Sequence, residues 1–215
     1  MQPELVADFA CECGENPLWH PFERRLYWVD IPTGRLFRFD PKTGASEECF
    51  RADEALGGFT IQADGSFLLF LARGAVKRLH AGALTTVVEE IPEERATRFN
   101  DVIADPAGRV FCGTMPTPDR AGRLYRLDVD GSLAMVLDGI ACSNGLAFTP
   151  DRRQMYYTDS GKAEVYLFDY DVVSGVISNR RLFYSREKEK GCPDGMTVDD
   201  EGYVWSAIWD GSCLL

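Results

Sequence analysis

Four oxygen-bearing side chains recur at one position of a repeated pattern in this 215-residue sequence. Five windows of sixteen residues align without a gap, at 15–30, 57–72, 100–115, 144–159 and 194–209. Their first positions hold Glu15, Gly57, Asn100, Asn144 and Asp194. Two carboxylates and two amides are hard oxygen ligands that suit Ca²⁺, Mg²⁺ or Mn²⁺, with Zn²⁺ as a further candidate. If the repeats bring these positions together, the column predicts a site for one divalent cation.

The same column has an alternative interpretation, in which Asn, Asp and Gly merely begin strands as turn residues. That interpretation suits Asn100, Asn144 and Asp194. It does not explain Glu15, which is a poor turn former and precedes Asn16-Pro17.

Each window has the pattern of a β-hairpin. An apolar third position opens a short strand, a turn rich in Asp, Pro and Gly follows, and a second strand carries bulky residues such as Tyr27 and Trp28. A second hairpin pattern follows each of the first four windows, at 34–50, 74–91, 122–137 and 163–184. The windows begin 42, 43, 44 and 50 residues apart, which is the length of a four-stranded propeller blade. The sequence therefore predicts an all-β propeller of four-stranded blades.

The repeats also predict the domain organisation. No linker or change of composition interrupts them, so residues 1–215 are expected to form a single propeller domain. The fifth repeat reaches GSCLL at 211–215, where its third strand is expected to begin. About four and a half repeats are therefore present, and we interpret the propeller as cut within the fifth.

Composition and the N-terminal sequence argue against two kinds of partner, nucleic acid and membrane. The net charge is −11 and the isoelectric point about 4.7, which argues against nucleic acid because such binding needs clustered Lys and Arg. The N-terminal sequence lacks a basic stretch followed by an apolar one, so neither a signal peptide nor a membrane anchor is expected. We predict a cytoplasmic protein, and no protein partner is evident from the sequence.

Nucleophilic catalysis by a serine triad is not indicated. His20 and His80 are the only histidines, and neither lies in the first column of the repeat. Ser143 lies in CSNG rather than in a GxSxG elbow.

Four motifs carry a family resemblance: GENPLWHPFERRLYWVDI, RFNDVIADPAGRVFCGTM, SNGLAFTPD and PDGMTVDDEGYVWSAIWDG. They resemble the gluconolactonase and regucalcin (senescence marker protein) family across essentially the whole chain. The resemblance implies a six-bladed β-propeller with one divalent cation, Ca²⁺ first among the candidates. It places the metal ligands on Glu15, Asn144 and Asp194, the substrate contacts on Arg98 and Asn100, and the general base on Asp194. The sequence departs from the family after GTM, where Asp119 is the only acid of PTPDRAG and regucalcin-like members carry a glutamate.

The resemblance implies a hydrolase that opens a small-molecule sugar lactone. The cation would polarise the carbonyl as a Lewis acid and bind the attacking water, and Asp194 would exchange protons with it. Arg98 and Asn100 would position sugar hydroxyls, although a surface arginine and a turn-capping asparagine are the ordinary alternatives. Two other functions stay open: a calcium-binding or protein-binding propeller without turnover, and an inactive fragment. The residues leave open which lactone is opened and which metal is bound.

Overall fold

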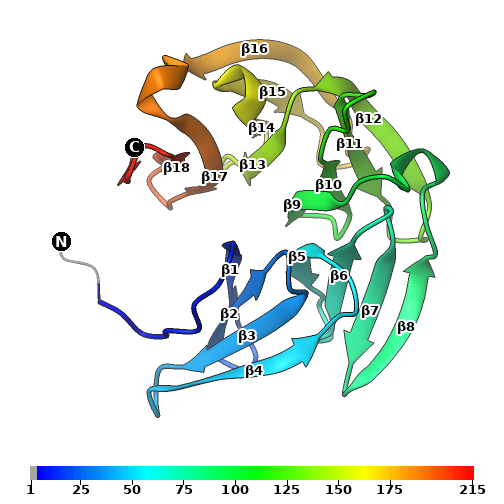
Figure 1. The fold of residues 1–215 in the computed structure, drawn as a ribbon. Helices are drawn as coiled ribbons and strands as arrows, with labels where there is room; N and C mark the ends of the chain where they lie inside the picture. The colour runs from blue at the N-terminus through cyan, green and yellow to red at the C-terminus, as the bar shows by residue number, and fades with distance from the viewer. Residues whose placement is uncertain (1–3) are drawn as a thin grey trace. The chain divides into compact units, whose positions relative to one another are not determined.

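The computed structural model describes residues 4–215, which contain five antiparallel β-sheets and three short 3₁₀ helices (Figure 1). The chain divides into two compact units, residues 1–98 and residues 99–215. Each unit is a series of sheets in which strands adjacent in the sequence are also adjacent in the sheet. This up-and-down order is that of propeller blades.

The first unit contains two four-stranded sheets. The strands of the first are β1 (Gly14–His20), β2 (Arg25–Asp30), β3 (Arg35–Asp40) and β4 (Ala45–Arg51). The strands of the second are β5 (Leu56–Ile61), β6 (Phe67–Leu71), β7 (Val76–His80) and β8 (Ala83–Val88), followed by the 3₁₀ helix η1 (Pro92–Glu94). Alternate apolar residues of β2, β5 and β6 form the unit's core, with Tyr27, Phe59 and Leu69 fully or almost fully buried.

The second unit begins with two four-stranded sheets and ends with a three-stranded one. The first sheet contains β9 (Phe99–Ala104), β10 (Val110–Thr114), β11 (Gly122–Leu127) and β12 (Leu133–Ile140). The second contains β13 (Ser143–Phe148), β14 (Gln154–Asp159), β15 (Glu164–Tyr170) and β16 (Ile177–Ser185). The third contains β17 (Cys192–Val198), β18 (Val204–Trp209) and β19 (Cys213–Leu214). The 3₁₀ helices η2 (Ser160–Lys162) and η3 (Lys188–Lys190) follow β14 and β16.

A buried ion pair ties the first two sheets of the second unit together. Asp105, after β9, accepts hydrogen bonds from Arg109 Nε at 2.5 Å and from the Tyr170 hydroxyl at 2.7 Å. The Arg109 guanidinium in turn donates to the carbonyl oxygens of Val172 and Val173, in the loop after β15. Because Asp105 is 5% and Arg109 8% exposed, this network is part of the interior.

The predicted hairpins are confirmed. Every sixteen-residue window is one antiparallel pair: β1–β2, β5–β6, β9–β10, β13–β14 and β17–β18. In the fifth repeat β19 pairs with β18, so the third strand begins where it was predicted. The prediction of an all-β propeller built from four-stranded blades is therefore confirmed, whereas a single domain spanning residues 1–215 stays a prediction.

Within residues 4–215, no helix is long and apolar enough to cross a membrane. The cytoplasmic location stays a prediction.

Candidate metal and substrate site

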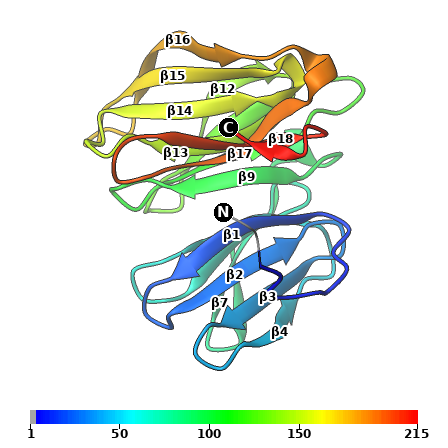
Figure 2. The same ribbon diagram turned by 90° about the vertical axis from the view of Figure 1, so that its left-hand side faces the viewer.

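Three β-bulges coincide with the first column of the repeat in residues 99–215. At each bulge, two residues of the first strand face a single residue of the second. The bulged pairs are Asn100–Asp101, Asn144–Gly145 and Asp194–Gly195, which face Gly113, Thr158 and Ala207 respectively. Bulges redirect a side chain out of the regular alternation and are frequent beside functional sites. The three bulges lie on neighbouring strands, because β13 contacts both β9 and β17 (Figure 2).

The structure brings two of the predicted ligands together. Asn144 is 7% exposed, and a Cβ on the next residue, Gly145, would lie 2.5 Å from the carbonyl oxygen of Asp194, so the two residues belong to segments in close contact. Burial raises the pKa of Asp194 above its ordinary value, and the Asn144 side chain and the Gly195 N–H partly oppose that rise. A cation would neutralise the charge of this half-buried carboxylate, and an amide oxygen is a second ligand of the kind that such a cation binds.

Asn100 lies at the bulge of β9 and also forms a hydrogen bond with the backbone next to Asn144. It is 8% exposed, and its Nδ2 donates a 2.8 Å hydrogen bond to the carbonyl oxygen of Ser143. That carbonyl belongs to the peptide group directly before Asn144. Asn100 therefore holds the backbone that carries one of the predicted ligands.

Sequence reasoning missed the contribution of Ser143. This fully buried residue accepts a 2.8 Å hydrogen bond at Oγ from the Tyr157 hydroxyl, and burial raises the pKa of Tyr157. Ser143 fits only because Gly113 has no side chain, since a Cβ there would lie 1.7 Å from Ser143 Oγ. The sequence contains both residues, the glycine of CGTM and the serine of CSNG, but local sequence patterns do not predict that they are in contact.

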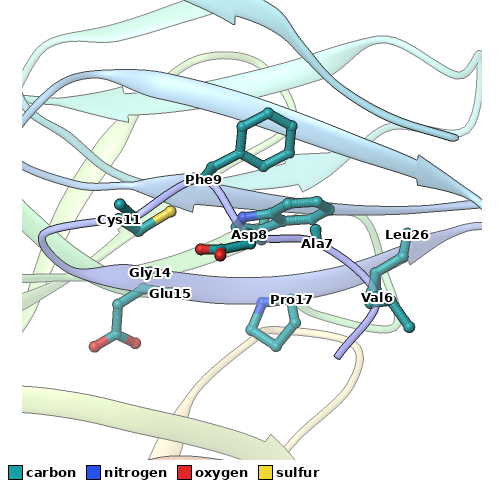
Figure 3. Close-up of a pocket in the computed structure, with 11 residues that line it drawn as sticks. Val6, Ala7, Asp8, Phe9, Cys11, Gly14, Glu15, Pro17 and Leu26 are labelled. Atoms are coloured by element: carbon teal, nitrogen blue, oxygen red, sulfur yellow. The ribbon is translucent and has the colours of Figure 1, made fainter. Parts of the chain in front are cut away.

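Glu15 belongs to the first unit. It lies half-buried on β1, where the Cys13 thiol contacts its Oε1 at 3.8 Å. It also lines a pocket of about 400 Å³ between residues 6–11 and the start of β1 and β2, and its carboxylate points away from the Phe9 ring (Figure 3). That Glu15 joins Asn144 and Asp194 around one cation stays a prediction.

Arg98 is the last residue of the first unit. It is half-buried and forms an isolated antiparallel bridge with Ala72, which fixes its backbone beside the end of β6. Its contact with a substrate stays a prediction.

The donor chemistry fits a divalent cation. Carboxylate and amide oxygens are the ligands that Ca²⁺ prefers, and the bulges of β17 and β13 carry one group of each kind, on Asp194 and Asn144. Among residues 4–215, no three His, Cys, Asp or Glu side chains gather into a metal-binding group. The predicted set is of another kind, because one of its three ligands is an amide.

Comparison with known proteins decides the family. The family described as SMP-30/Gluconolactonase/LRE-like region matches residues 13–215. The chain belongs to this family. The resemblance predicted from the four motifs is thereby confirmed.

Relatives within the SMP-30/gluconolactonase family are similar over nearly the whole chain. Pentonolactonase XacC of Haloferax volcanii is 49% identical over 210 residues, which are 98% of this chain and 71% of that protein. The structure of a luciferin-regenerating enzyme is 33% identical with a TM-score of 0.86, covering 94% of this chain and 71% of that one. A regucalcin of Agrobacterium tumefaciens, described as a calcium-binding protein, has the same fold, with a TM-score of 0.87 at 22% identity over 95% of this chain and 70% of that one.

Proposed function

We propose that this chain hydrolyses the cyclic ester of a sugar lactone, and that a five-carbon aldonolactone is the first substrate to test. One observation carries this function: the chain is 49% identical, over 98% of its length, to a protein named as a pentonolactonase. The close packing of the Asn144–Gly145 bulge against Asp194 supports placing the reaction at the bulges of the second unit.

The reaction is addition of water followed by ring opening. The oxygen of water bonds to the lactone carbonyl carbon, and the bond between that carbon and the ring oxygen then breaks. One proton of the water moves to the ring oxygen, which leaves as a hydroxyl group. The product is the open-chain hydroxy acid.

Asp194 is the residue that would move this proton. Its half-buried carboxylate would orient the attacking water, accept a proton from it and return that proton to the ring oxygen. Asn144 lies at the corresponding bulge of the neighbouring strand β13.

Glu15, Asn144 and Asp194 would hold the cation, with Ca²⁺ the first candidate and Zn²⁺, Mn²⁺ and Mg²⁺ as alternatives. When bound, the cation supplies Lewis-acid polarisation of the ester carbonyl.

Arg98 and Asn100 would bind the sugar hydroxyls. The Arg98 guanidinium offers several donors in one plane. Asn100 donates through Nδ2 to the Ser143 carbonyl, and its side-chain amide would also contact a sugar hydroxyl. This arrangement couples substrate binding to the backbone before Asn144.

Acid release from a panel of aldonolactones tests the function. The protein is treated with a chelator, dialysed, and assayed with each divalent metal added back. We expect a pentonolactone to be opened, with activity lost on chelation and restored by at least one metal. Absence of acid release from every lactone, by a protein that binds Ca²⁺ in calorimetry, would instead support a calcium-binding propeller without turnover.

A further inference from the structure

Ser160 holds the peptide group directly before Asp194. Its hydroxyl donates a 2.5 Å hydrogen bond to the carbonyl oxygen of Pro193. Ser160 is 9% exposed, so water competes poorly for that carbonyl. The two residues come from different sheets, because Ser160 begins η2 after β14 and Pro193 lies in β17.

Ser160 is itself fixed to the start of β13. Its N–H donates to the Cys142 carbonyl at 3.0 Å, and its own carbonyl accepts from the Ala163 N–H at 3.0 Å. The preceding carboxylate, that of Asp159, accepts the Cys142 N–H at 2.9 Å. Cys142 lies two residues before Asn144, so Ser160 connects the backbone segments that carry both predicted ligands of this unit.

The segment around Ser160 is closely packed. A Cβ on Gly161 would lie 2.5 Å from the Cβ of Ala141, so the chain packs there without space for a side chain. Lys162 forms an ion pair with Asp159, with Nζ 3.2 Å from Oδ2. This packing and the ion pair therefore hold the segment from which the Ser160 hydroxyl reaches the Pro193 carbonyl.

We propose that Ser160 is a positioning residue, which holds Asp194 at the distance and orientation that let it act together with Asn144. This inference rests on the proposed function of Asp194. A fixed Pro193–Asp194 peptide restricts rotation about the bonds that aim the Asp194 side chain. Asn100 does the same for the peptide before Asn144, through its hydrogen bond to the Ser143 carbonyl. Both predicted ligands thus follow a peptide group held by a buried side chain of the preceding sheet.

Three variants test this role. Ser160→Ala removes the hydroxyl, and Ser160→Thr retains it. Ser66→Ala is the matched control, because Ser66 is also a buried serine, and its hydroxyl donates to the Asp64 carboxylate at 2.6 Å in the first unit. For each protein we would measure Ca²⁺ affinity by calorimetry, kcat and KM for the lactone, the melting temperature, and the NMR signals of the Asn144 side-chain amide.

Ser160→Ala should weaken Ca²⁺ binding and lower kcat by about 10- to 100-fold, as is usual when a partner that orients a metal ligand is removed. KM for the lactone should change little, Ser160→Thr should recover most of both losses, and the Asn144 amide signals should move only in Ser160→Ala. Equal behaviour of Ser160→Ala and Ser66→Ala in all of these measurements, including the amide signals, would overturn the positioning role. If wild type neither bound Ca²⁺ nor opened a lactone, yet Ser160→Ala alone shifted the Asn144 signals, the proposed function would be wrong and the positioning of Asp194 would stand.

Discussion

Gly113 and Ser143 share one small space between β10 and β13: a Cβ on Gly113 would lie 1.7 Å from the hydroxyl oxygen of Ser143. The missing side chain in one sheet thus allows a buried serine in the next. Through its carbonyl and its hydroxyl, that serine accepts hydrogen bonds from Asn100 and Tyr157. The residue before Asn144 thus packs against a glycine thirty residues earlier in the chain.

Gly113→Ala should therefore destabilise the protein by about 1–3 kcal/mol, the usual cost of overpacking a tightly packed interior. Urea unfolding measures this loss. Ser143→Gly supplies the control, because it removes the atoms that the new methyl group would meet. In that background Gly113→Ala should cost at least about 1 kcal/mol less, and equal costs in both backgrounds would contradict the shared space.

Asp105→Asn should cost about 3–5 kcal/mol of folding free energy, because it leaves the buried Arg109 guanidinium without its carboxylate. The matched control is Asp169→Asn, which removes the acid of an exposed pair with Arg181. That pair should contribute less than about 1 kcal/mol. Unfolding curves of the two variants should differ clearly, and similar small losses would show that the Asp105 network is not a major tie between its sheets.

The stabilisation by Asp105 should also depend on pH. Burial alone would raise the pKa of Asp105, but hydrogen bonds from Tyr170, Arg109 and nearby backbone N–H groups lower it below its ordinary value. A group whose pKa is lower in the folded protein stabilises it above the unfolded pKa, about 3.9 for aspartate, and loses that effect as pH falls through the folded pKa. The difference in unfolding free energy between wild type and Asp105→Asn should thus be full at pH 7 and shrink below about pH 4. A constant difference down to pH 2 would be inconsistent with this account.

Thr158→Val should leave stability unchanged or raise it by up to about 1 kcal/mol. Thr158 is fully buried, and its hydroxyl has no hydrogen-bond partner among residues 4–215. Thr114 occupies the same position of the repeat one blade earlier and is equally buried, but its Oγ1 accepts the Arg123 N–H at 3.1 Å. Thr114→Val should cost about 1–3 kcal/mol, since it leaves that N–H unpaired. Thermal unfolding of the two variants measures this difference. Equal losses of stability would show that the Thr158 hydroxyl also has a hydrogen-bond partner.

Asp194→Asn should lower lactone kcat by about 100-fold or more, because it removes the proposed base and one ligand charge together. Arg98→Ala should chiefly raise KM, since it removes a substrate contact. Asp199→Asn is the control, because Asp199 accepts from the Trp205 indole N–H in the β17–β18 turn and lies outside the column of ligands. Near-normal kcat for Asp194→Asn at saturating metal would exclude Asp194 as the base.

Much of the fold follows from local sequence. Apolar alternation and turns of Asp, Pro and Gly recur at a nearly constant interval, so local residue patterns alone locate the five hairpins. The common register also put Asn100, Asn144 and Asp194 at equivalent points of successive strands, and the structure places each of them at a bulge.

Only the tertiary structure decided how Asn100, Asn144 and Asp194 are held in position. The bulges could not be predicted, because one extra residue in a strand depends on the pairing partner rather than on the strand itself. The contacts Asn100–Ser143 and Ser160–Pro193 join residues 43 and 33 positions apart, and they exist because neighbouring sheets pack closely enough for side chains of one to reach the backbone of the next. Residue types and spacing determined which groups are available for chemistry, and packing between sheets determined their orientation.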